Sequence, residues 1–257
     1  MTFKDLIKRH RAALICVVLV FLALSLFFQL FSLFPTRRLV RAIKKDNVTA
    51  AERWLKRGID PDVSATPSNV PYVFISRTAE AYSPERPILY ACINQDEDMV
   101  RLLLSYGARP DYSAFWWIFN KEPLTDGSVA IVKILLENGG FYSMRESVQE
   151  FKPHTDIRYE YSLIGDLMRN SSDRPEESES ATRCAILMLE YSGDFYRQYD
   201  ELLYDAAKCR NAELVAYLLE NGWPQTYADP IGRTAYGLAQ EKGYADIVRI
   251  FDDFNGK

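Results

Sequence analysis

Residues 229–251 read DPIGRTAYGLAQEKGYADIVRIF, a pattern that predicts a turn followed by two short helices. Gly232 permits the positive φ of a tight turn, and the Thr234 hydroxyl can accept hydrogen bonds from the free N–H groups of a helix start. Gly243 separates a first helix with small side chains from a second with apolar residues at helical spacing. Neither helix is long enough to bury its apolar side alone, so the unit requires copies of itself.

Such copies recur upstream at intervals of about 33 residues. Three further copies are clear, and two are half-preserved. The clear copies occupy residues 39–61, 88–111 and 202–222, and the half-preserved copies end in residues 132–140 and 187–194. One copy alone would be weak support, but six in order predict a repeat protein.

The series resembles the ankyrin-repeat family. Asp229, Gly232 and Thr234 stand at the family's turn positions, whereas Ala235 and Tyr236 replace its Pro and Leu. The resemblance implies an all-α, ankyrin-repeat solenoid of about six helix-turn-helix repeats. It also implies a concave face of inner helices and projecting hairpins that recognises another protein.

The repeat domain is expected to span residues 37–257. We place its repeats near residues 37–63, 86–111, 112–140, 161–195, 200–226 and 229–254. Two intervals between repeats exceed the family's period, which indicates inserted segments. The insertions are residues 64–85, 141–160 and 170–180. The last of them is polar and acidic, which is typical of a solvated loop.

Residues 12–34 form an apolar run without a charged side chain. As a helix it would be roughly 34 Å long, enough to cross a hydrocarbon core of about 30 Å. The run is too long for the apolar part of a cleaved signal peptide, and no small-residue cleavage site follows it. We therefore expect one transmembrane helix after a short basic cytoplasmic N-terminus, residues 1–11.

The number of basic residues is nearly the same on both sides of the apolar run, so this count does not by itself favour one orientation of the helix. The short basic N-terminus favours retention in the cytoplasm. We therefore expect a single-pass protein of a bacterial inner membrane with its ankyrin domain in the periplasm. The reverse orientation is the alternative.

The charge distribution restricts the partners. The net charge is −4, residues 1–35 carry +3, and the remainder therefore carries −7. Phosphate binding requires a basic face, so a nucleic-acid partner is not expected. The common metal, phosphate and nucleophile motifs are absent from the sequence. We expect no enzymatic activity, no cofactor, no metal and no small-molecule substrate.

The cysteine pattern is not that of a disulfide framework. Cys16 lies in the apolar run, and Cys92 occupies a core position of a repeat helix. The preferred interpretation is that the cysteines are small buried hydrophobes. A bridge between Cys184 and Cys209, in adjacent repeats, is the alternative.

The candidate partner-binding residues are aromatic or polar and lie in the insertions or on expected inner helices. They are Tyr72, Phe74, Tyr82, Tyr90, Asn94, Trp116, Trp117 and Tyr159. Exposed Trp and Tyr are common hot-spot residues at protein interfaces. The competing interpretation is that the aromatic side chains are buried among neighbouring repeats.

The resemblance and the apolar run together predict a membrane-tethered module that binds another protein. Bacterial ankyrin proteins occur beside secreted antibacterial toxins, including lipases delivered by type VI secretion, as immunity proteins. The resemblance therefore implies immunity as one role. A scaffold or stress-response accessory protein that supports a membrane or periplasmic enzyme is the alternative, because a fold alone does not define a function.

Overall fold

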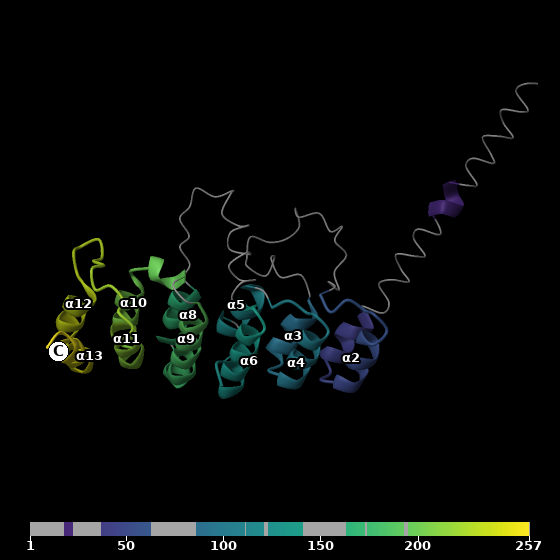
Figure 1. The fold of residues 1–257 in the computed structure, drawn as a ribbon, viewed down its shortest axis with the longest axis horizontal. Helices are drawn as coiled ribbons and strands as arrows, with labels where there is room; N and C mark the ends of the chain where they lie inside the picture. Colours follow the sequence, from purple (N-terminus) through teal and green to yellow (C-terminus); the bar gives the residue numbers. More distant parts are fainter. Residues whose placement is uncertain are drawn as a thin grey trace, which may run out of the picture. The chain divides into compact units, whose positions relative to one another are not determined.

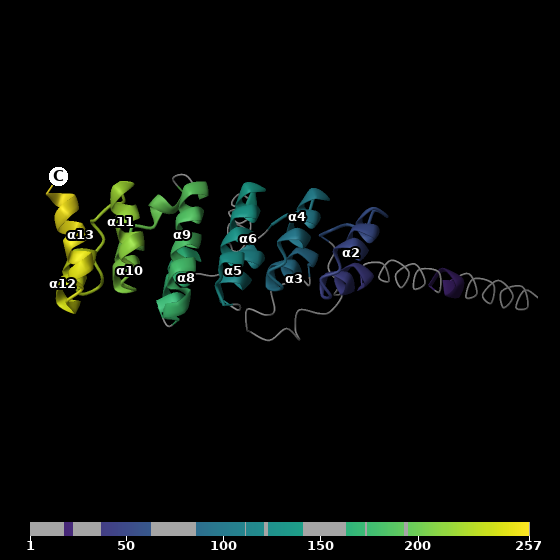
Figure 2. The same cartoon turned by 90° about the horizontal axis from the view of Figure 1, so that it is seen from below.

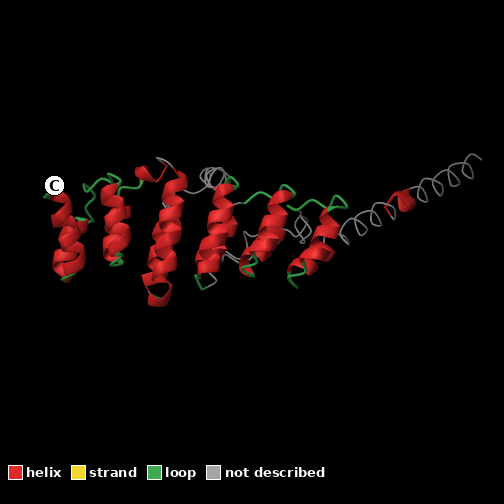
Figure 3. Ribbon diagram, turned by 60° about the horizontal axis from the view of Figure 1, so that its bottom comes forward, coloured by secondary structure: helices red, strands yellow, loops and turns green. Residues whose placement is uncertain are grey.

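The structure is a computed structural model, and it describes most of the chain. The described residues are 18–22, 37–62, 86–110, 112–120, 123–140, 163–172, 174–192 and 195–256. Within these ranges the chain is helical, and extended pairing is limited to one bridge between Ala228 and Thr234 (Figure 3). The chain divides into two compact units, Met1–Pro87 and Ile88–Lys257.

The first unit contains a helical segment at residues 37–43 and helix α2, Val48–Leu55. Asn47 begins α2, because its side-chain oxygen accepts a 2.9 Å hydrogen bond from the backbone N–H of Ala50. An Asn at this position satisfies one of the four N–H groups that have no partner inside the helix.

The helices after residue 86 come in pairs (Figure 1). The pairs are α3 (Pro87–Ile93) with α4 (Glu97–Ser105), α5 (Tyr112–Asn120) with α6 (Asp126–Glu137), α8 (Leu163–Ser172) with α9 (Ser178–Ser192), α10 (Leu202–Lys208) with α11 (Ala212–Glu220), and α12 (Ala235–Lys242) with α13 (Ala245–Asn255). The 3₁₀ turns η4 (Pro175–Glu177) and η5 (Phe195–Gln198) lie before and after α9.

Contacts between pairs arrange the helices of the second unit in two rows (Figure 2). In the first row, α8 contacts α5 and α10, and α10 contacts α12. In the second row, α4, α6, α9, α11 and α13 contact one another in that order. Each pair therefore buries its apolar side against the next pair, as expected for stacked repeats.

The turn before α2 and those that join α3 to α4, α10 to α11 and α12 to α13 each contain one left-handed residue. Gly243, which the sequence places between two helices, has φ 69°. Asp46, Gln95 and Arg210 have φ values of 50°, 54° and 55° at the corresponding turns of other pairs. A non-Gly residue pays a steric cost in this region. The packing of the pairs therefore imposes the turn even where the sequence has no Gly.

The aromatic segment of α5 is divided between core and surface. Phe115 and Phe119 are fully buried, with ring centroids 6.3 Å apart. Trp116 and Trp117 are half-buried, and their rings meet edge to face at 5.8 Å. The interpretation of burial therefore holds for the phenylalanines, whereas each tryptophan keeps part of its surface accessible.

Residues 170–180 connect two helices, and Ser172, Glu176, Ser178 and Glu179 there are exposed, but the connection is shorter than predicted and partly packed. Helix α8 continues to Ser172, η4 follows, and α9 already begins at Ser178. Glu177 is buried, and its carboxylate lies 2.9 Å from the guanidinium of Arg174. A charge-assisted hydrogen bond offsets the cost of burying this carboxylate, which allows a polar sequence to pack.

The alternative of a disulfide between Cys184 and Cys209 is not realised, because both side chains are free thiols. Cys184 is buried, and burial raises its pKa to about 12, despite the opposing effect of Arg183. Burial also raises the pKa of the half-buried Cys209. The interpretation as a small buried hydrophobe fits Cys184 and the equally buried Cys92.

Three predicted segments fall largely or wholly outside the described residues. Of the predicted transmembrane run, the structure describes only residues 18–22, which are helical and exposed. No helix in the described part of the chain has both the length and the hydropathy needed to cross a membrane. The predicted insertions at 64–85 and 141–160 lie outside the described residues altogether.

Candidate functional site

The sequence-predicted binding residues do not form one site in the described part of the chain. Tyr72, Phe74, Tyr82 and Tyr159 lie outside the described residues. Tyr90, on α3, is half-buried, and Asn94, just after the end of α3, is exposed. Trp116 and Trp117 lie on α5, in the first row.

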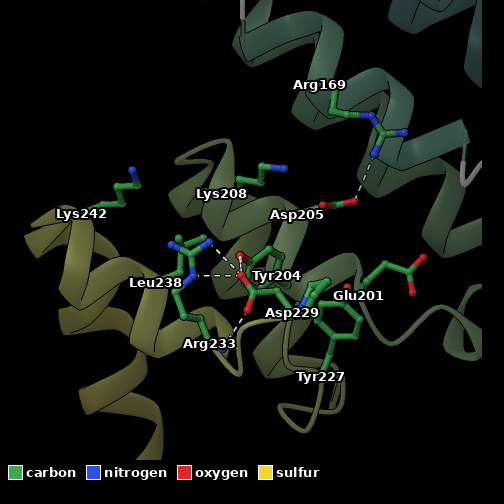
Figure 4. Close-up of a pocket in the computed structure, with 11 residues that line it drawn as sticks. Arg169, Glu201, Tyr204, Asp205, Lys208, Tyr227, Asp229, Arg233, Leu238 and Lys242 are labelled. Atoms are coloured by element: carbon green, nitrogen blue, oxygen red, sulfur yellow. Dashed lines mark hydrogen bonds and ion pairs between the residues drawn. The ribbon is translucent and has the colours of Figure 1, made fainter.

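The structure contains a pocket that the sequence did not reveal. It has a volume of about 570 Å³ and lies along the first row, over α8, α10 and α12 (Figure 4). We call it the α8–α12 pocket. Its lining residues are Arg169, Glu201, Tyr204, Asp205, Lys208, Tyr227, Asp229, Pro230, Arg233, Leu238 and Lys242.

Asp229 organises one wall of this pocket. Its Oδ2 accepts hydrogen bonds from the Tyr204 hydroxyl at 2.7 Å and from Nε of Arg233 at 2.9 Å (Figure 4). Its Oδ1 accepts from the backbone N–H groups of Ile231 at 3.1 Å and Arg233 at 2.9 Å. Burial alone would raise the pKa of Asp229, but these hydrogen bonds outweigh it and hold the pKa well below its ordinary value.

Arg233 fastens the turn to helix α12. Its guanidinium lies 2.8 Å from the Asp229 carboxylate and 3.1 Å from the carboxylate of Glu241, on α12. Hydrogen bonds to these two carboxylates raise the pKa of Arg233 further, so its charge is permanent. The turn at residues 229–233 is therefore held at both ends, by α10 through Tyr204 and by α12 through Glu241.

Two tyrosines give the pocket an aromatic wall. The rings of Tyr204 and Tyr227 meet edge to face with centroids 5.4 Å apart. Burial is the main cause of the raised pKa of Tyr227, and the nearby carboxylates of Glu201 and Asp205 add to it. Burial, with the hydrogen bond to Asp229, likewise raises the pKa of Tyr204. Both phenols are thus neutral at physiological pH and offer both apolar and hydrogen-bonding surface.

The basic residues of the pocket fall into two groups. Arg169 is paired with Asp205 at 3.3 Å, and Arg233 is paired as described above. Lys208 and Lys242 are exposed and form no hydrogen bond or ion pair with another described residue (Figure 4). They end two adjacent first-row helices, α10 and α12. Their ammonium groups are therefore available to a ligand.

These groups suit the binding of a polar ligand, and nothing in their arrangement resembles a nucleophile paired with a base. Among the described residues, no three His, Cys, Asp or Glu side chains are grouped so that they could hold a metal ion. Because the arginines are ion-paired and the phenols are neutral, the two lysines are the positively charged groups of the pocket that a ligand can pair with directly.

The sequence contained one signal for this site. Lys208 and Lys242 lie about one repeat period apart, each at the end of a helix that starts a repeat. The sequence predicts Asp229 only as a turn residue, because it does not show that the carboxylate reaches Tyr204 on the preceding repeat.

Comparisons with known proteins agree with this fold. Residues 86–114 match the family model described as Ankyrin repeat. No curated protein matches the chain. The crystal structure of EF0377, an ankyrin repeat protein, is similar over 84% of this chain and 96% of that chain, with a TM-score of 0.51 and 19% sequence identity. At that identity the likeness concerns the fold alone, and it confirms the prediction of ankyrin repeats.

Proposed function

We propose that this ankyrin-repeat chain is a non-enzymatic module that binds a partner protein across its first-row helices, with the α8–α12 pocket at the centre of the contact. Ankyrin repeats indicate a protein-interaction module. One observation supports the choice of this surface. Hydrogen bonds and ion pairs of Asp229 and Arg233 hold residues 229–233 in place beside two unpaired lysines.

A pre-organised surface favours binding because few side chains must be ordered when the partner arrives. The Tyr204 and Tyr227 rings and the Arg233 guanidinium are already held by contacts within the chain. Tyr and Arg are also the residue types most often found at binding hot spots. Trp116 and Trp117, on α5 in the same row, extend the proposed contact surface.

Site-specific photo-crosslinking tests the proposal. A benzophenone amino acid is placed at Tyr227 in the pocket, or at Arg249, which is exposed on the second-row helix α13. In the cells that make this protein, we expect an adduct with a protein at position 227 and none at 249. No adduct at 227, or the same adducts at both positions, would overturn the proposal.

We further propose that the apolar run at residues 12–34 tethers the protein to a membrane, because the run is long enough to cross a bilayer. In our proposal it places the repeat domain in the periplasm of a bacterium. The support is the short basic N-terminus. Reporter enzymes fused to the C-terminus test this orientation, and reporter activity found only in the cytoplasm would refute it.

The resemblance to bacterial ankyrin proteins beside secreted toxins makes immunity to a type VI lipase-type toxin one form of this function. A scaffold or stress-response accessory role for a membrane or periplasmic enzyme is the other. Competition of a deletion strain with its parent separates the two roles. Loss of survival only in contact with toxin-secreting sister cells supports immunity, and unchanged survival speaks against it.

A further inference from the structure

We propose that the α8–α12 pocket binds an acidic segment of the partner protein, and that Lys208 and Lys242 each receive a carboxylate of that segment. The inference rests on the proposed protein-binding function. It adds to it the chemical class of the bound segment and the two side chains that select it.

Among the charged side chains that line the pocket, the two lysines lack a partner of opposite charge in the described part of the chain. Asp229 is engaged by Tyr204 and Arg233, and Asp205 is engaged by Arg169. Glu201 also has an interaction within the chain. No ion pair or hydrogen bond joins either lysine side chain to another described residue, so an anionic ligand gains ion pairs there without displacing an existing one.

The position of the lysines suits an extended segment. Lys208 and Lys242 end α10 and α12, which contact each other, so both ammonium groups belong to the same side of the row. The pocket lining also includes the side chain of Leu238 and the rings of Tyr204 and Tyr227. A peptide can therefore place carboxylates at the two lysines and other atoms against apolar and aromatic surface of the same pocket.

The surrounding charge favours a short acidic segment over a long polyanion. Residues 88–257 carry 17 basic and 28 acidic side chains, a net charge of −11. This charge repels a nucleic acid, whose binding needs a continuous basic face. At physiological salt, exposed charges more than about 8 Å apart are largely screened from one another. A few carboxylates placed beside the lysines therefore interact mainly with the lysine charges. The same screening makes the binding weaken as salt increases.

The test combines crosslinking with a defined peptide. The full chain in a neutral detergent is titrated into a fluorescein-labelled ten-residue peptide of alternating Glu and Ser, and into the matching peptide of alternating Gln and Ser. Fluorescence anisotropy reports binding. Two exposed ion pairs together correspond to about a tenfold change in affinity. We therefore expect the variant Lys208→Gln/Lys242→Gln to bind the Glu peptide about tenfold more weakly.

A matched control separates the pocket from the net charge. The variant Lys133→Gln/Arg249→Gln also removes two exposed positive charges, from the second-row helices α6 and α13. We expect it to bind the Glu peptide as the native chain does. Circular dichroism melting shows whether either variant is less stable, since a lysine at a helix end also interacts with the helix dipole.

The outcomes distinguish the inference from the function on which it rests. An adduct at position 227 that maps to an acidic segment, and that weakens in the Lys208/Lys242 variant, supports both. An adduct that maps to a segment without Asp or Glu, or that persists in that variant, overturns only the inference. Three results of the peptide assay also overturn only the inference. They are equal binding of the two peptides, no binding of the Glu peptide, and binding of labelled single-stranded decathymidylate more tightly than the Glu peptide. No adduct at position 227 overturns both.

Discussion

Replacing Asn211 with Ala should remove a helix cap together with two hydrogen bonds that its Nδ2 donates, to Oγ1 of Thr182 and, at 3.4 Å, to Sδ of Met168. Asn211 is buried and begins α11, where its Oδ1 accepts a 3.0 Å hydrogen bond from the backbone N–H of Leu214. Its Nδ2 donates a 2.6 Å hydrogen bond to Oγ1 of Thr182, on α9 of the preceding pair. One side chain therefore starts a helix and connects two repeats.

The expected loss follows mainly from the N-cap hydrogen bond and the hydrogen bond to Thr182, since the sulfur of Met168 is a weak acceptor. Removing an N-cap Asn costs about 1 kcal/mol of stability. The hydrogen bond to Thr182 contributes about 1 kcal/mol more. Thr182 remains satisfied by donating to the carbonyl oxygen of Ser178, so no additional penalty for a stranded group is added. We expect Asn211→Ala to lower the free energy of unfolding by about 2 kcal/mol.

Asn47 provides the control. It caps α2 through the same kind of hydrogen bond but is exposed. Asn47→Ala should therefore cost only about 1 kcal/mol. Urea unfolding followed by circular dichroism measures both variants. A double-mutant cycle of Asn211→Ala with Thr182→Val should give a coupling energy of about 1 kcal/mol. Equal losses for the two Asn variants, together with a coupling energy near zero, would refute the reasoning.

Three further predictions concern the pocket, the packing and the thiols. The pKa of Asp229 is lower in the folded chain than its unfolded value of about 3.9, so its contribution to the free energy of unfolding is present above that pH and is lost as the pH falls. Urea titrations should therefore show a shallower loss of stability in acid for Asp229→Asn than for the native chain. An added Cβ at Gly140 would lie 2.7 Å from the carbonyl oxygen of Leu135, so Gly140→Ala should lower the melting temperature. An added Cβ at Gly237, inside α12, would meet only Oγ1 of Thr234 at an ordinary contact distance of 3.5 Å, so Gly237→Ala should raise stability by about 0.5–1 kcal/mol. Melting temperatures that move in the same direction would contradict this pair. Cys184, buried and with a pKa raised to about 12, should be inert to Ellman's reagent at pH 8, so Cys184→Ala should reduce the reactive thiol count only in guanidinium.

The repeat fold was accessible from sequence because its units are local. Apolar spacing and the turn signal at Asp229 and Gly232 are properties of short stretches, and they recur. Local patterns did not specify every turn. Gln95 and Arg210 adopt left-handed conformations without Gly, and the acidic stretch between α8 and α9 contains a 3₁₀ turn with one buried carboxylate, Glu177. These details depend on contacts between the packed helices.

That short amphipathic helices must stack follows from the sequence alone, since neither helix of a repeat can bury its apolar side alone. Which polar residues meet on the stack depends on the packing of the folded chain. Tyr204 and Asp229 are separated by a whole helix and its turn, yet their side chains lie 2.7 Å apart. Lys208 and Lys242 likewise share a pocket only because α10 packs against α12. Periodicity specifies the face of a helix that is buried, whereas a binding site depends on side chains brought together from successive repeats.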